Sequence, residues 1–143
     1  MGRLLAIDYG RKRCGIAVTD TLQICANGLT TVRACDIMTF LKEYCSKEIV
    51  DKIIVGLPRQ MDGSPSESSR YIEPFLKHLH REMPDMIVER YDERFTSTLA
   101  HRAMLDGGLR RMARRDKELV DEIAATIILN DYLSSRLHDT ADL

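Results

Sequence analysis

The sequence predicts an α/β domain built on a mixed β-sheet. Three short apolar stretches with strand-like spacing open the chain, at about residues 3–9, 15–18 and 29–33. From about residue 36 onward, helices with one apolar face alternate with strands rich in β-branched residues. The chain has 143 residues, the length of one ordinary domain. We therefore expect a single domain over residues 1–143, with a tail that frays from about 138 to 143.

The first two strands are expected to form a β-hairpin. Residues 3–9 and 15–18 are apolar, and Gly10–Arg13 between them is typical of a turn. This places Asp8 at the hinge of the hairpin. Gly28 precedes the third strand, which is expected at about Leu29–Arg33.

The middle of the chain is expected to alternate between helix and strand. Asp36 is a candidate N-cap for a helix with one apolar face. A central strand follows at about 52–57, bounded by Pro58, and a turn-rich loop leads to a helix that starts at Ser66 and ends before Pro84. The apolar positions of these two helices are Ile37, Leu41, Tyr44 and Cys45, and then Ile72, Phe75, Leu76 and Leu79.

The last third of the chain is expected to hold one strand and two helices. The strand covers about Met86–Glu93, and a helix capped by Thr96 or Ser97 ends at Gly107–Gly108. The final helix runs from about Asp116 to Arg136. Its expected buried stripe consists of Val120, Ile123, Ala124, Ile127 and Ile128. Antiparallel opening strands followed by parallel strands give a five-stranded mixed sheet flanked by helices.

Composition limits the kinds of partner. The net charge is −1, so an anionic ligand must be met by a local basic patch. The four cysteines form no Cys-x-x-Cys pair, and Cys14 and Cys25 fall in apolar strand-like contexts, which indicates buried free thiols and a reducing compartment. No stretch has the length of a signal peptide or a transmembrane helix. We expect a cytoplasmic protein with no membrane partner.

Three acidic positions are candidate metal ligands. Asp8 ends an apolar strand beside Gly10, although an Asp in this place also commonly caps a turn. Asp92 and Glu93 are neighbours on a strand and cannot both face one metal, and we choose Glu93. Asp121 is the acid of the last helix nearest to the sheet, although it would also be explained as a solvated rim residue. Carboxylates gathered from distant segments stay ionised at neutral pH when a cation binds them, so the set predicts a divalent metal.

Two basic clusters lie next to two of these acids. One follows Asp8 and the other precedes Asp121, and Arg94 follows Glu93. Such clusters bind a phosphate backbone with little sequence preference, although charge runs are usually solvated loops and Arg94 would also form an ordinary surface ion pair. The candidate nucleic-acid-binding residues are Arg11, Lys12, Arg13, Arg94, Arg110, Arg111, Arg114 and Arg115.

Four motifs in order resemble the YqgF/RuvX family. They are Ala6-Ile-Asp8-Tyr-Gly10-x-Lys12-Arg13-x-Gly15, Val55-Gly-Leu-Pro58 with Met61-Asp-Gly63, Asp92-Glu-Arg94-Phe-Thr96-Ser97, and Val120-Asp121-x-x-Ala124-Ala125-x-x-Ile128-Leu129. Members of this family are described as pre-16S rRNA nucleases and as Holliday-junction resolvases, within the RNase H-like superfamily. Cys14 stands where an aliphatic residue is expected.

The resemblance implies an RNase H-like fold with Asp8, the Asp92–Glu93 pair and Asp121 at a catalytic centre. It also implies a role in maturing the 5′ end of pre-16S rRNA. The mechanism that follows is two-metal phosphodiester hydrolysis, with Asp8 holding both ions and Glu93 and Asp121 completing one site each. Oxygen ligands favour Mg²⁺, with Mn²⁺ as a substitute.

Other functions remain open on the sequence alone. The substrate would be pre-rRNA or branched DNA, because backbone-binding residues do not encode the sugar or the branch. A non-catalytic RNA-binding module would keep the fold and give the acids structural roles. The Asp8-x-Gly10 pattern is also similar to the phosphate loop of actin-like ATPases, which need two such lobes. Without an exposed apolar stripe, we expect a monomer or a weak homodimer.

Overall fold

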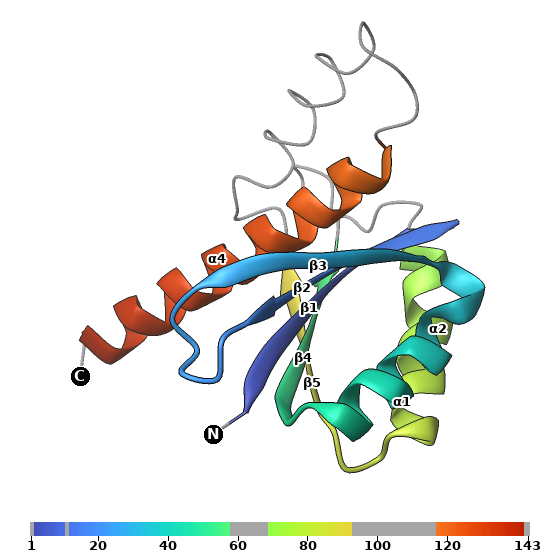
Figure 1. Cartoon of the computed structure of the whole chain (residues 1–143), viewed down its shortest axis with the longest axis horizontal. Helices are drawn as coiled ribbons and strands as arrows, with labels where there is room; N and C mark the ends of the chain where they lie inside the picture. Colours follow the sequence, from blue (N-terminus) through green and yellow to red (C-terminus); the bar gives the residue numbers. More distant parts are fainter. Residues whose placement is uncertain (1, 11, 58–68, 93–116, 142–143) are drawn as a thin grey trace, which may run out of the picture.

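A five-stranded mixed sheet forms the centre of the molecule (Figure 1). The structure is a computed structural model, and it describes residues 2–10, 12–57, 69–92 and 117–141. The strand order is β3-β2-β1-β4-β5, in which β1 pairs antiparallel with β2 and parallel with β4. The strands are β1 (Arg3–Tyr9), β2 (Arg13–Thr19), β3 (Ala26–Arg33), β4 (Val50–Leu57) and β5 (Ile87–Asp92). The expected α/β fold and five-stranded mixed sheet are confirmed.

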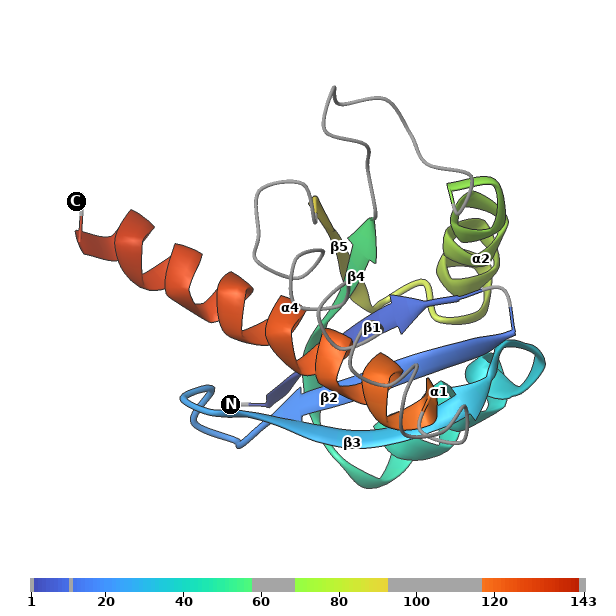
Figure 2. The same cartoon turned by 90° about the horizontal axis from the view of Figure 1, so that it is seen from above.

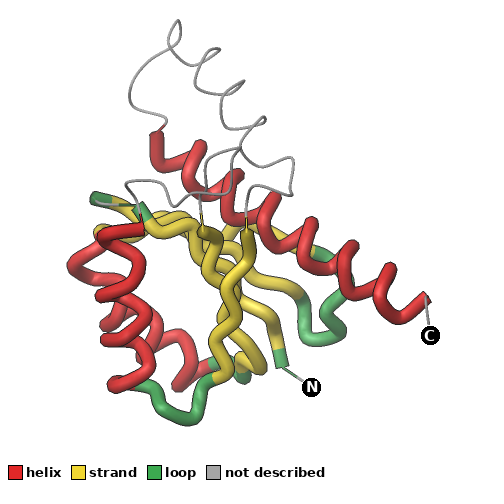
Figure 3. Tube along the Cα trace, turned by 180° about the vertical axis from the view of Figure 1, so that it is seen from behind, coloured by secondary structure: helices red, strands yellow, loops and turns green. Residues whose placement is uncertain are grey.

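Helices cover both faces of this sheet. Figure 3 shows α1 (Ile37–Lys47) and α2 (Ser69–Glu82) on one side of it and α4 (Lys117–Ala141) on the other. A short 3₁₀ turn, Ala34–Asp36, leads into α1. Helix α4 packs against β1, β2 and β3, and makes fewer contacts with β4.

The alternation of side chains along β1 divides the core in two. Leu5 and Ile7 belong to the cluster under α1 and α2, whereas Leu4 and Ala6 belong to the cluster under α4. All four are almost completely buried. A central strand covered on both faces is apolar at successive positions, which explains the unbroken apolar run of residues 4–7.

Strand β3 begins three residues earlier than expected, so that Gly28 lies inside it. Ile16 pairs with Thr30 and Ala17 pairs with Gly28, which leaves one extra residue in β3 as at a β-bulge. A Cβ atom on Gly28 would lie 3.1 Å from Glu122 Oε1 of α4. The glycine therefore marks the place where the helix approaches the strand closely.

Two local expectations differ from the structure in part. Asp36 occupies the N-cap position of α1 as expected, but its side chain makes no capping hydrogen bond, because the 3₁₀ turn before the helix already gives it helical backbone angles. Cys25 is exposed, because it lies in the loop before β3 rather than on a core face, whereas Cys14 is buried as expected.

The buried stripe of α4 differs from the expected one. Ala125, Leu129 and Tyr132 are buried together with Ala124 and Ile128, while Ile123 and Ile127 are only partly buried. The stripe is therefore rotated toward the positions 121, 125, 128 and 132, which repeat at helical spacing. Position 121 has the helical spacing of this stripe.

The remaining expectations concern the ends of segments. Helix α4 continues to Ala141, five residues beyond the expected end at Arg136. The start of α2 at Ser66 and the helix expected between Thr96 and Gly108 lie outside the described residues. The single domain and the frayed tail stay predictions. Within the described ranges, no helix is both long enough and apolar enough to span a bilayer.

Candidate active site

Asp8 is the residue on which the site is built. It lies near the C-terminal end of β1, the middle strand of the sheet, and its exposed fraction is only 6%. Among the described residues it is the one charged side chain that is buried. By alternation it shares the α4 face with Leu4 and Ala6. A carboxylate in such a place is costly unless hydrogen bonds or a cation stabilise it.

Glycines occupy the strand positions on both sides of Asp8. Gly15 of β2 pairs directly with Asp8. On the other side Ile7 pairs with Val55 of β4, so the next position in register brings Gly56 alongside Asp8. Neither neighbour has a side chain that would cover the carboxylate on the α4 face. The two strand neighbours of Asp8 therefore contribute only backbone to the site.

The turn after Asp8 depends on a close backbone approach at Gly10. The Gly10 amide donates a hydrogen bond to the carbonyl oxygen of Arg13 at 2.9 Å. A Cβ atom on Gly10 would lie 2.5 Å from the same oxygen, closer than non-bonded atoms approach each other. A side chain at position 10 would therefore open the turn that connects Asp8 to Arg13.

Tyr9 fixes the other face of the strand end. Its ring stacks on Phe75 of α2, with a centroid separation of 4.5 Å. Burial raises the pKa of the Tyr9 hydroxyl, with a smaller contribution from Cys14. The tyrosine therefore stays neutral at physiological pH and serves as packing beneath the strand that carries Asp8.

The C-terminal ends of β4 and β5 lie at the same edge of the sheet as that of β1. Gly56 pairs with Tyr91, and Leu57 pairs with Asp92 in the parallel register of β4 and β5. Tyr91 faces α4, where its ring meets Tyr132 edge-on at 6.1 Å and its hydroxyl lies 3.2 Å from Ser135 Oγ. The strand position of Asp92 therefore has the opposite parity to Tyr91 and to Asp8. Glu93 lies outside the described residues.

Position 121 is brought to the same face of the sheet as Asp8. It lies one helical turn before Ala124 and Ala125, which are both completely or almost completely buried against the sheet. Helix α4 begins toward the edge of the sheet where β1 ends and runs away from it (Figures 1 and 2). The side chain of Asp121 is not among those the structure describes.

A polar group anchors the second half of α4 across the sheet. Lys52 Nζ of β4 donates a hydrogen bond to Glu89 Oε1 of β5 at 2.9 Å and another to the Tyr132 hydroxyl at 3.5 Å. The hydrogen bond to Glu89 raises the pKa of Lys52, and burial raises the pKa of Tyr132. These contacts help to hold α4, and with it position 121, in place over the sheet.

Only two of the predicted basic residues lie in the described part of the chain. Lys12 and Arg13 lie in and directly after the turn that follows Asp8, where Lys12 is exposed and Arg13 is half-buried. Arg11, Arg94, Arg110, Arg111, Arg114 and Arg115 lie outside the described residues. In the part of the chain that the structure covers, three or more metal-binding side chains do not gather at one point. The side chains of Asp92, Glu93 and Asp121 are not among those described.

The donor set nevertheless suits a hard cation. Asp8 offers carboxylate oxygens, which Mg²⁺ prefers as ligands, beside two strand positions without side chains. No thiol faces this point, because Cys14 lies on the opposite face of β2 in the cluster under α1 and α2. The described part of the site therefore fits an oxygen-bound divalent metal.

A protein-family comparison covers almost the whole chain. The model of the family described as "RuvX: Holliday junction resolvase" matches residues 2–135. Curated relatives carry the name "Putative pre-16S rRNA nuclease". The relative from Phocaeicola vulgatus is 58% identical over 136 residues, which are 95% of this chain and 98% of that protein. The relative from Parabacteroides distasonis is 56% identical over 136 residues, with 95% and 97% covered.

Solved structures support the fold. RuvC of T. thermophilus, solved in complex with a Holliday junction substrate, has a TM-score of 0.58 at 18% identity and covers 96% of each chain. The fowlpox virus Holliday junction resolvase has a TM-score of 0.52 at 16% identity, with 93% of this chain and 99% of that chain covered. These likenesses show the RNase H-like fold expected from the sequence. The family match and the curated relatives establish that the chain belongs to the RuvX family.

Proposed function

We propose that this protein is a divalent-metal-dependent nuclease that hydrolyses phosphodiester bonds while maturing the 5′ end of pre-16S rRNA. The observation that carries the proposal is the buried carboxylate of Asp8, which lies between two glycines near the C-terminal end of the central strand β1. Its position on the face of α4 agrees with a site completed by an acid from that helix. The names of the curated relatives support rRNA as the substrate class.

Asp8, Glu93 and Asp121 are the proposed catalytic and metal-binding residues. Position 121 supports the set because the rotated stripe of α4 turns that position toward the sheet. The choice of Glu93 over Asp92 is supported by strand parity. Tyr91 faces α4, as Asp8 does, and the strand position of Asp92 has the opposite parity.

The proposed metal is Mg²⁺, with Mn²⁺ as a substitute. Bound between these carboxylates, a pair of divalent ions would supply charge stabilisation and in-line orientation at the phosphate. The chain itself contributes rigidity, because Asp8 lies on a central strand that is buried on both faces. Preorganised charges of this kind need little rearrangement during the reaction.

Basic residues next to the acids are proposed to hold the phosphate backbone. Lys12 and Arg13 lie directly after the Asp8 strand, and the Gly10 turn determines where Arg13 begins β2. Arg11, Arg94, Arg110, Arg111, Arg114 and Arg115 complete the proposed set. Their contribution to binding should decrease with increasing salt, because each phosphate contact releases counterions.

The decisive experiment is a cleavage assay on the Asp8→Asn variant. Asn keeps the volume of the side chain but removes its charge, so we expect cleavage of a pre-16S rRNA 5′ fragment in Mg²⁺ to be abolished. Asp85→Asn, which changes an exposed acid in the turn before β5, is the matched control and should cleave like the wild type. Thermal melting and RNA binding in EDTA would verify that both variants fold. Unchanged cleavage by Asp8→Asn would remove this residue from the mechanism.

A comparison of two further variants decides whether Glu93 or Asp92 is the metal ligand. Glu93→Gln should abolish cleavage, whereas Asp92→Asn should retain most of it, because neighbouring strand positions face opposite sides of the sheet. The reverse result would assign Asp92 as the ligand.

Holliday-junction resolution is the second candidate function, favoured by the description of the matching family. The same assay should therefore include a four-way DNA junction. Preferential, symmetric cleavage of the junction would replace the rRNA assignment and would require a dimer. RNA binding without metal-dependent cleavage would favour a non-catalytic binding module. A monomer or weak homodimer and a cytoplasmic location remain part of the proposal.

A further inference from the structure

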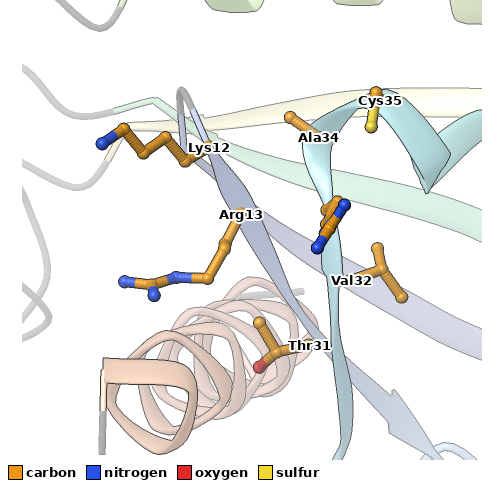
Figure 4. A pocket seen from close by; sticks show the side chains of 7 residues that line it. Lys12, Arg13, Thr31, Val32, Ala34 and Cys35 are labelled. Carbon is orange, nitrogen blue, oxygen red and sulfur yellow. The ribbon is translucent and has the colours of Figure 1, made fainter. Parts of the chain in front are cut away.

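A basic groove lies where the β1–β2 turn meets the end of β3 (Figure 4). It has a volume of about 520 Å³, within the range of small-molecule binding sites. Three cations line it, Lys12, Arg13 and Arg33, together with Thr31 and Cys35. Among the described residues of its wall, none is acidic. Arg33 was not among the residues expected to bind nucleic acid.

The strand register explains why these cations converge. Arg13 of β2 pairs directly with Arg33 of β3, and the Ala34 amide donates a hydrogen bond to the Lys12 carbonyl oxygen at 2.9 Å. Residues directly opposite on antiparallel strands have Cβ atoms about 4.5–5.5 Å apart. The register therefore starts both arginine side chains from neighbouring positions on one face of the sheet, within reach of a common anion.

The groove is adjacent to the candidate active site. Asp8 pairs with Gly15, and Gly15 pairs with Thr31, so Asp8 and the start of the groove lie on one line across three strands. Strands are about 4.8 Å apart, which separates the backbones of Asp8 and Thr31 by roughly 10 Å. In Figure 4, Lys12 and Arg13 extend in the same direction from the turn. A short stretch of nucleic-acid backbone is long enough to reach from Asp8 to the groove.

We infer that this groove binds the sugar-phosphate backbone next to the bond that is cut, and that Arg33 is a phosphate-binding residue. The inference rests on the proposed nuclease function and adds a subsite to it. Two guanidinium groups suit this role, because each can hold phosphate oxygens through a pair of hydrogen bonds.

Binding measurements on Arg33→Gln test the inference without requiring catalysis. Affinity for a fluorescein-labelled single-stranded RNA is measured in EDTA over a range of salt concentrations. We expect Arg33→Gln to weaken binding about threefold to tenfold and to reduce the slope of log K against log salt by about 0.7, the value for one phosphate contact. Arg33→Lys should restore part of the affinity. Arg81→Gln, at the far end of α2, is the matched control and should bind like the wild type.

The native cysteines provide a second readout. Cys35 lines the groove and is exposed, whereas Cys25 is exposed at the opposite end of β3. Bound RNA should slow alkylation of Cys35 by iodoacetamide severalfold and leave Cys25 unaffected, as followed by mass spectrometry. This footprint uses the unmodified protein, so misfolding of a variant cannot mimic it.

The outcomes separate this inference from the nuclease proposal. Unchanged affinity of Arg33→Gln, or equal alkylation of Cys35 with and without RNA, would overturn the groove even if the wild type cleaves. If the wild type binds RNA and both expected effects are seen, but it does not cleave, the inference that the groove binds RNA stands and the proposed nuclease function is refuted. Failure of the wild type to bind RNA at all would overturn the groove as well.

Discussion

Gly10→Ala tests how the turn after β1 positions the site. The added Cβ would lie 2.5 Å from the Arg13 carbonyl oxygen, whereas ordinary van der Waals contact begins near 3.4 Å. The turn must therefore open by almost 1 Å, which lengthens the 2.9 Å hydrogen bond between Gly10 and Arg13 beyond bonding distance. The obstacle is a backbone atom and cannot rotate away.

The energetic cost follows from these distances. Loss of the hydrogen bond costs about 0.5–1.5 kcal/mol, and the overpacked turn costs about 1–3 kcal/mol. Replacing glycine by alanine returns about 0.4–1 kcal/mol through the unfolded state. We expect a net loss of about 0.5–4 kcal/mol. Because Arg13 moves with the turn, RNA affinity should also decrease.

Urea denaturation followed by circular dichroism measures this loss. With an m-value of about 2 kcal/mol/M, the midpoint should decrease by about 0.3–2 M. Gly28→Ala is the matched control, since its Cβ would meet only side-chain atoms, Glu122 Oε1 at 3.1 Å and Thr126 Oγ1 at 3.3 Å, which can move aside. It should lose clearly less stability. A Gly10→Ala protein with wild-type stability and wild-type RNA affinity would refute the reasoning.

Three further predictions concern the scaffold. Ile128→Ala should lose about 2–5 kcal/mol of unfolding free energy in urea denaturation, because the Ile128 side chain is fully buried. Ile127→Ala should lose much less, because Ile127 is only partly buried. Equal losses would contradict the buried stripe of α4. Hydrogen bonds from the amides of Cys25 and Ile24 lower the pKa of Asp20 below its usual 3.8. The stabilisation of the folded state by the Asp20 carboxylate is therefore present above pH 3.8 and is lost as the pH falls through the lower pKa of the folded state. The stability difference between wild type and Asp20→Asn should therefore shrink on acidification, and an Asp20 titration by NMR at or above the usual pKa would disprove this. The hydrogen bond to Glu89 raises the pKa of Lys52 above 10.5. The loss of unfolding free energy in Lys52→Met should therefore be complete below pH 10.5 and should disappear as the pH rises through the higher pKa of the folded state. A loss that does not depend on pH would argue against the ion pair.

Much of the candidate site could be anticipated because it depends on local patterns. The apolar run before Asp8 predicts a buried strand ending in an acid, and the turn-like Gly10–Arg13 predicts the hairpin that follows. The third strand could also be anticipated up to Arg33. Its pairing with Arg13 was missed because the register of two strands joined by a loop depends on hydrogen bonds that the apolar pattern does not specify. A bulge at Gly28 then changes that register once more.

The amino-acid sequence by itself determined which of the described segments become strands and helices, and it identified the family through four ordered motifs. Only the tertiary structure decided that Asp8 and position 121 lie on one side of the sheet, that Gly15 and Gly56 flank the acid, and that Arg33 lies opposite Arg13. The reason is that periodicity specifies which residues of one element share a face. Which faces meet is decided by packing between elements, such as that of Ala125 and Ile128 of α4 with Leu4 and Ala6 of β1.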